Sequence, residues 1–159
     1  MNKQPVANNQ TSRNSRRKSH RSLYAIAAVL SLIGLADAIY LTVEHLVGET
    51  AGCIVSKGCS EVLGSKYAAV GPVPLAAFGA LAYFAAFSLA ILALFEYQRV
   101  QTFLMLLVQS MFAVNLWLLL LQAFVLHAFC DYCLLSAAVT LVLTATAFAA
   151  HIRTQPLSS

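Results

Sequence analysis

The chain alternates between long apolar runs and short polar segments. Four runs hold no more than one charged residue each, and they cover residues 23–43, 73–95, 101–125 and 131–150. Each is close to or above the roughly 20 helical residues that cross a bilayer, and each is apolar around most of its circumference. None alternates residue by residue as the strands of a membrane barrel do. The pattern predicts an all-α integral membrane protein, a bundle of four transmembrane helices.

Composition leaves little room for a soluble domain. Hydrophobic residues make up 60% of the 159 residues and charged residues only 10%, whereas about one quarter of a soluble domain is charged. We therefore expect one membrane domain over residues 23–150, with a long first loop at 44–72. A basic segment, 1–22, and a short tail, 151–159, flank this domain, and the basic segment is expected to be disordered.

The positive charges predict the orientation of the bundle. Only Lys57 and Lys66 lie in the first loop. The other basic residues fall on the opposite side of the predicted membrane: Lys3, Arg13, Arg16, Arg17, Lys18, Arg21, Arg99 and Arg153. This asymmetry predicts cytoplasmic termini in the inner (plasma) membrane, and it favours a topology signal over a nucleic-acid-binding arm. A cleaved signal peptide ending at "ADA", residues 36–38, fits less well because the apolar pattern continues beyond it.

Four cysteines fall on the predicted outer side, Cys53 and Cys59 in the first loop, Cys130 and Cys133 where the fourth helix begins. They suit a redox relay, two structural disulfides or a four-thiolate zinc site. The C-x5-C spacing is looser than zinc sites use, and an oxidising compartment disfavours free thiolates. A short C-x-x-C bridge adds little stability, whereas a helix N-terminus stabilises a thiolate. These arguments favour redox chemistry without a metal, with Cys130 as the attacked sulfur, although Asp131 would oppose its ionisation.

Other polar residues occur inside the predicted spans. Asp37 is costly at mid-membrane, so it is expected near the outer end or facing the bundle, as a proton-handling group or a helix-packing partner. Asn115 and Gln122 share one face of the third helix, where interhelical hydrogen bonding is the expected role. Asp37 and Asn115 are also the weaker candidates for contact with a cofactor.

The order of these motifs resembles the vitamin K epoxide reductase family, and its bacterial branch in particular. The likeness rests on the C-x5-C pair, Ser65 six residues after the second cysteine, the "GPVP" turn at 71–74, and the C-x-x-C pair that opens a later helix. "YLTVEHL" at 40–46 is also similar to family members, and the likeness covers about residues 20–150.

The resemblance implies a quinone-dependent thiol–disulfide oxidoreductase that supports disulfide formation in exported proteins. A periplasmic thioredoxin-like partner would reduce a Cys53–Cys59 disulfide, and a transient Cys59–Cys130 disulfide would lead to the Cys130–Cys133 pair. Cys133 would then meet menaquinone or ubiquinone, with Ser65 as a nearby hydrogen-bond donor. Because the chain ends nine residues after the fourth run, the partner is expected to be a separate protein. The alternative is a non-enzymatic membrane scaffold with structural disulfides or a zinc site.

Overall fold

The computed structural model describes residues 5–47, 69–70, 73–95 and 97–154, and every structural statement below concerns these residues. They contain four helical segments long and apolar enough to cross a membrane: Arg21–Val47, Leu75–Ala93, Arg99–Leu126 and Asp131–Ile152. The predicted all-α class with four transmembrane helices is confirmed.

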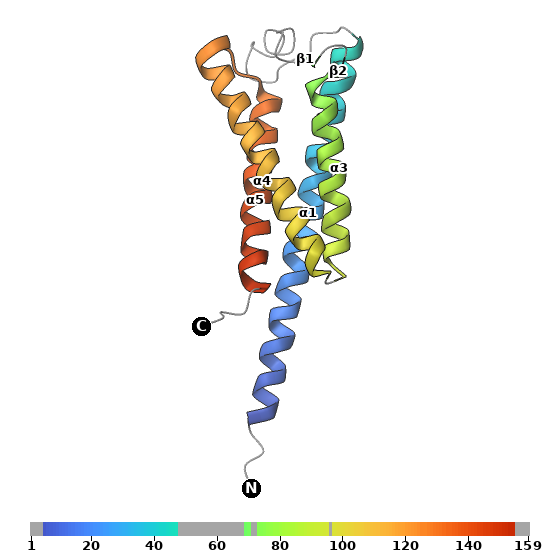
Figure 1. Ribbon diagram of the computed structural model, residues 1–159, viewed down its shortest axis with the longest axis vertical. Helices are drawn as coiled ribbons and strands as arrows, with labels where there is room; N and C mark the ends of the chain where they lie inside the picture. Colours follow the sequence, from blue (N-terminus) through green and yellow to red (C-terminus); the bar gives the residue numbers. More distant parts are fainter. Residues whose placement is uncertain (1–4, 48–68, 71–72, 96, 155–159) are drawn as a thin grey trace.

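The helices form a ring. The helical elements are α1 (Pro5–Val47), α3 (Leu75–Ala93), α4 (Gln98–Leu121), the π-helical turn η1 (Gln122–Leu126) and α5 (Asp131–Thr154). Both α1 and α4 pack against α3 and α5, so the order around the bundle is α1, α3, α4, α5. The start of α1 and the end of α5 lie at one end, at the bottom of Figure 1, and we call this the terminal end. The opposite end, where α5 begins, is called the cysteine end.

A tight antiparallel hairpin precedes α3. Strands β1 (Ala69–Val70) and β2 (Val73–Pro74) pair Ala69 with Pro74 and Val70 with Val73. Pro74 is the N-cap of α3, in an extended conformation with φ of −64° and ψ of 139°. Proline suits this place because its fixed φ is compatible with a helix start and it has no N–H to leave unpaired. The second helix therefore begins at Leu75, two residues after the start of the predicted run at 73.

Helix α1 is longer than the apolar pattern predicted. It begins at Pro5, so most of the basic segment 1–22 is helical where its composition predicted disorder. Two physical reasons account for the difference. A proline at a first helical turn is favourable, and neither glycine nor proline occurs again before Gly34. Extending a helix that already exists also needs no new nucleation step.

Small residues allow α1 and α3 to approach closely. A side chain at Gly34 would overlap the ring of Tyr83 on α3, so only glycine fits there without movement. Buried alanines continue this contact: Ala27, Ala28, Ala86, Ala90 and Ala93. Such residues favour helix association in membranes because van der Waals packing, rather than water exclusion, holds the helices together. Most of this packed core lies toward the terminal end.

Candidate functional site

Cys130 occupies the N-cap position of α5. The backbone N–H of Leu134 donates to the carbonyl oxygen of Cys130 at 3.0 Å, which is the first hydrogen bond of the helix. Cys130 is fully buried, and its own N–H donates to Oε1 of Gln122 at 3.1 Å. The predicted position of this cysteine, at the start of the fourth helix, is confirmed. Both Cys130 and Cys133 are free thiols in the structure.

The environment of Cys130 favours its thiolate. The pKa of the thiol is lowered to about 7, chiefly by a hydrogen bond with the Cys133 side chain. Burial opposes this shift, whereas hydrogen bonds from the backbone N–H groups of Cys133 and Tyr132 support it, and the charge of Asp37 opposes it. Unpaired N–H groups in a first helical turn stabilise an anion in this way. About half of Cys130 is therefore ionised at neutral pH.

Gln122 connects η1 to the C-x-x-C pair. Its side chain is 2% exposed, its carbonyl oxygen accepts from Cys130, and its amide lies within hydrogen-bonding reach of Cys133. The widened π-turn ends at His127, whose φ of 49° is left-handed and is the single positive φ of a non-glycine residue among the described ones. The sequence suggested a hydrogen bond between helices for Gln122. Such a bond is present, because Gln122 accepts from the residue that caps α5 and reaches Cys133 within α5.

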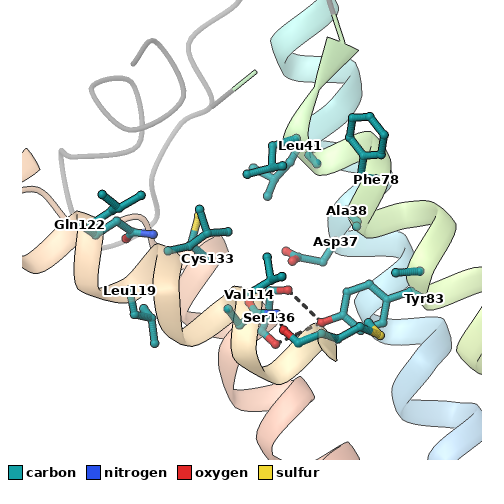
Figure 2. Close-up of a pocket in the computed structure, with 18 of the residues that line it drawn as sticks. Asp37, Ala38, Leu41, Phe78, Tyr83, Val114, Leu119, Gln122, Cys133 and Ser136 are labelled. Atoms are coloured by element: carbon teal, nitrogen blue, oxygen red, sulfur yellow. Dashed lines mark hydrogen bonds between the residues drawn. The ribbon is translucent and has the colours of Figure 1, made fainter. Parts of the chain in front are cut away.

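The helices surround a partly open cavity of about 330 Å³ at the cysteine end. All four transmembrane segments contribute to its walls, which are mainly aliphatic. Figure 2 shows Cys133 at this cavity together with Gln122, and Asp37 pointing into it from α1. The volume lies within the range of small-molecule sites, which combine apolar walls with a few polar groups. Cys133, unlike Cys130, is part of the lining.

A hydrogen-bond network closes one side of the cavity. The hydroxyl of Tyr83 lies 2.8 Å from both Oγ of Ser136 and Oγ1 of Thr140. Nδ2 of Asn115 donates to Oγ1 of Thr140 at 3.3 Å and to the carbonyl oxygen of Met111 at 3.0 Å. The network joins α3, α4 and α5, so the interhelical hydrogen bond expected of Asn115 is present.

Sequence reasoning missed Tyr83, Ser136 and Thr140. A signal was available for the α5 residues, because positions 133, 136 and 140 share one face of a helix. Tyr83 was harder to find, since a tyrosine in an apolar run is most often a packing residue. Its hydroxyl finds its hydrogen-bond partners only once α3 and α5 are packed in the same bundle.

Asp37 has no hydrogen-bond partner in the part of the chain that the structure describes. It is 8% exposed, and neither of its carboxyl oxygens reaches a donor or acceptor there. Figure 2 shows the carboxyl group directed into the cavity, on the side of Cys133 and Ser136. It faces the bundle interior, which is one of the two placements predicted for it.

The structure gathers Asp37, Asn115 and Cys133 around one cavity and places Cys130 directly beside it. The other predicted site residues, Cys53, Cys59 and Ser65, lie outside the described residues.

The fold and the site together define a multi-pass membrane protein that presents a dithiol at an apolar internal cavity. The model of the vitamin K epoxide reductase family matches residues 25–148. This match covers most of the chain, so the protein belongs to the vitamin K epoxide reductase family, and membership implies oxidoreductase activity. A search of curated proteins found no match to the chain.

Proposed function

We propose that the protein transfers electrons from a separate thioredoxin-like partner, through its two cysteine pairs, to a membrane quinone, either menaquinone or ubiquinone. Its physiological role is then to support disulfide formation in exported proteins. The observation that carries this proposal is the position of Cys133 in the wall of the apolar cavity, one turn below an N-cap cysteine whose pKa is lowered to about 7. A membrane-soluble acceptor and a thiol pair can meet at such a place.

The thiol steps follow ordinary disulfide exchange. A thiolate of the partner attacks Cys53 of the Cys53–Cys59 disulfide, and Cys59 leaves as a thiolate. Cys59 then attacks Cys130 of an oxidised Cys130–Cys133 pair, forming a transient Cys59–Cys130 disulfide and releasing Cys133. Cys53 is freed when a second partner thiol resolves its mixed disulfide. When Cys53 attacks Cys59, the relay disulfide breaks and leaves Cys130 and Cys133 both reduced.

The low pKa of Cys130 suits it to this exchange. A thiol of lower pKa is the better leaving group, so the Cys59–Cys130 bond breaks readily on the Cys130 side. The hydrogen bond from Cys133 then stabilises the thiolate that is released. Ser65 is proposed as a hydrogen-bond donor near this centre.

The cavity fits a quinone ring. Its walls are mainly aliphatic, and it has polar groups in Asp37, Asn115 and Gln122 that can face carbonyl oxygens. The carboxyl of Asp37 is without a partner among the described residues, as expected of a group that serves a ligand. When bound, a quinone supplies an acceptor for two electrons and two protons. Cys133 is the sulfur that faces it.

The arrangement of the helices supports the proposed orientation. The start of α1 and the end of α5 lie at the terminal end, and so does Arg99, near the beginning of α4. The cysteine pair lies at the opposite end. By the positive-inside rule the terminal end is then cytoplasmic, and the cysteine end faces the periplasm or its equivalent.

The test is a reconstituted turnover assay. Purified protein in nanodiscs is mixed with a reduced thioredoxin-like protein and either ubiquinone-1 or menadione, and loss of the quinone absorbance is followed. Turnover is expected with the wild type and not with the Cys130→Ala variant. Absence of turnover, together with one bound zinc per chain by metal analysis, would support the scaffold alternative.

A further inference from the structure

We propose that Asp37 is a catalytic proton carrier, whose carboxyl group gives a proton to a quinone oxygen in the cavity and regains one from the Cys130–Cys133 pair. This inference rests on the proposed quinone chemistry and assigns the residue that supplies its protons. It starts from the buried carboxyl of Asp37, for which the described residues provide no hydrogen-bond partner.

Asp37 occupies a position that is unusual for a carboxyl group. It is 8% exposed, lies within a transmembrane span, and directs its carboxyl group into the cavity. Acidic residues inside membrane spans are rare because they are costly, and they mark proton or substrate pathways when they face an internal cavity. A role in helix packing would show as a hydrogen bond to a neighbouring helix. Among the described residues, neither carboxyl oxygen makes one.

The contrast with the other polar groups of the cavity strengthens this argument. The side chains of Tyr83, Ser136 and Asn115 each have a hydrogen-bond partner on another helix, and these bonds hold α3, α4 and α5 together. Within the part of the chain that the structure describes, these groups are satisfied and Asp37 is not. Native proteins rarely tolerate an unpaired buried carboxyl, so one that persists calls for a ligand or a catalytic role.

Asp37 also lies near the two sulfurs of the C-x-x-C pair. Asp37 is close enough to act electrostatically on both Cys130 and Cys133. Two negative charges so placed repel each other, so a proton released by the thiol pair is held readily by Asp37, and a proton on Asp37 favours the Cys130 thiolate. An unpaired carboxylate in an apolar interior is itself unfavourable, and the group avoids that cost by holding a proton.

These properties give a balanced step. The reduced pair loses two electrons and two protons overall and becomes the Cys130–Cys133 disulfide, and the quinone gains two of each and becomes a quinol. The carboxyl of Asp37 passes its proton to one quinone oxygen and is restored by one proton from the thiol pair, while the second thiol proton goes to the other quinone oxygen. The state of Asp37 is therefore unchanged after one turnover.

The experiment compares Asp37→Asn with wild type in nanodiscs. The pre-reduced protein is mixed with menadione for a single turnover, so the exchange with the partner protein is not measured. Asparagine retains the size and a hydrogen-bond donor but cannot transfer a proton. We expect the rate to fall about 100-fold, the lower end of the range for general acid catalysis. Ser31→Ala is the matched control, because Ser31 is a fully buried polar residue on the same helix. Its hydroxyl donates to the backbone carbonyl oxygen of Ala27, one turn earlier in α1. This variant should react at the wild-type rate.

Binding is measured separately from turnover. Menadione binding to the nanodiscs is measured by isothermal titration calorimetry, because Trp117, the single tryptophan of the chain, is 64% exposed and does not line the cavity. The affinity of Asp37→Asn should stay within about tenfold of wild type, since the amide can still donate a hydrogen bond. A rate equal to that of wild type at saturating menadione would overturn the inference, as would a rate loss that saturating menadione restores.

Infrared spectroscopy of the wild type tests the proton directly and does not depend on the folding of a variant. Asp37 and Asp131 are the two aspartates of the chain, so labelling aspartate with ¹³C isolates them. We expect a protonated carboxyl band that shifts when menadione binds. A spectrum showing only ionised aspartate, or a protonated band that menadione leaves unchanged, would overturn the inference. If the wild type fails to reduce menadione at all, the proposed function fails and this inference fails with it.

Discussion

The two ends of the bundle are built from the same helices but packed differently. Toward the terminal end, Leu104, Val108 and Leu143 are at most 1% exposed and fill the space between helices together with buried alanines. Toward the cysteine end the helices leave a cavity of about 330 Å³. Its walls include the thiol of Cys133 and the carboxyl of Asp37, which has no hydrogen-bond partner among the residues that the structure describes.

This difference separates what holds the protein together from what makes it react. Helices in lipid associate through close van der Waals contact, so the packed end accounts for much of the stability. A cavity forfeits such contacts. Keeping one open and lining it with polar groups therefore indicates a ligand. Substitutions at the cysteine end should alter turnover, and substitutions at the terminal end should alter stability.

The largest effect is expected from Cys133→Ser. Quinone turnover should be abolished, because without Cys133 no Cys130–Cys133 disulfide can form. The Cys130 thiolate can still attack Cys59 of the loop disulfide and release Cys53, and no thiol then remains beside Cys130 to displace Cys59 from it. A stable Cys59–Cys130 bond should accumulate while the protein remains in the membrane, and mass spectrometry of a non-reduced digest identifies it. A Cys53–Cys130 bond would reverse the roles proposed for the loop cysteines. An intact Cys53–Cys59 bond in every molecule would contradict the relay.

The second prediction isolates the cause of the low pKa of Cys130. In a variant that carries Cys53→Ala and Cys59→Ala, the thiolate absorbance of Cys130 should titrate with a midpoint near its pKa of about 7. Adding Cys133→Ala removes the hydrogen bond that contributes most to this low value. The pKa should then rise toward its ordinary value of 9.0, because burial raises it and only the backbone N–H groups of α5 remain to lower it.

The direction of the shift fixes the effect at neutral pH. A thiol is ionised above its pKa, so raising the pKa as far as 9.0 lowers the thiolate fraction at pH 7 by about 50-fold. An unchanged midpoint would mean that the backbone N–H groups of α5 alone stabilise the thiolate.

The third prediction concerns Gln122. The Gln122→Leu variant leaves the N–H of Cys130 buried without its acceptor, a cost of about 1–3 kcal/mol that falls on the reactive cysteine. Turnover should drop by about tenfold, measured with ubiquinone-1 at saturation. Gln101→Leu is the matched control, because Gln101 is a buried glutamine in the same transmembrane segment, Arg99–Leu126, but near the terminal end. Equal losses in both variants would show that the effect is general to buried glutamines.

The smallest effect on turnover is expected from Leu143→Ala. Leu143 is fully buried in the packed core, and its truncation should lower the free energy of unfolding by roughly 2 kcal/mol, near the lower end of the soluble range because lipid is itself apolar. Unfolding in mixed detergent micelles measures this. Leu141→Ala, 56% exposed on the same helix, should change stability little. Turnover per folded molecule should match wild type in both variants, and a specific loss in Leu143→Ala would break the separation between the two ends.

Much of the fold could be predicted because the bilayer imposes simple rules on length and polarity. The four apolar runs correspond to four helices, and the C-x-x-C motif opens the last of them as expected. The extension of α1 to Pro5 was missed. The polar composition of the first residues shows that they cannot be buried, but it does not show how easily an existing helix extends through them.

The site was harder to predict because it depends on how helices face each other. The cysteines are recognisable from their spacing alone. Ser136 and Thr140 share a helix face with Cys133, but their partner Tyr83 is more than fifty positions away in the sequence, and no local pattern signals that contact. The π-turn that directs Gln122 to Cys130 could not be predicted from the sequence either, because its residues also occur in ordinary α-helices.

The length of α1 determines how far its start stands from the lipid. At about 1.5 Å per residue, the part of this helix before Arg21 is roughly 24 Å long, and Figure 1 shows it extending past the ends of the other helices. A fluorophore at the start of α1 and one at the end of α5 would occupy the same side at different heights. Energy transfer to a dye in the lipid headgroups would then be weaker from α1, and a quencher that cannot cross the membrane would reveal which compartment both occupy.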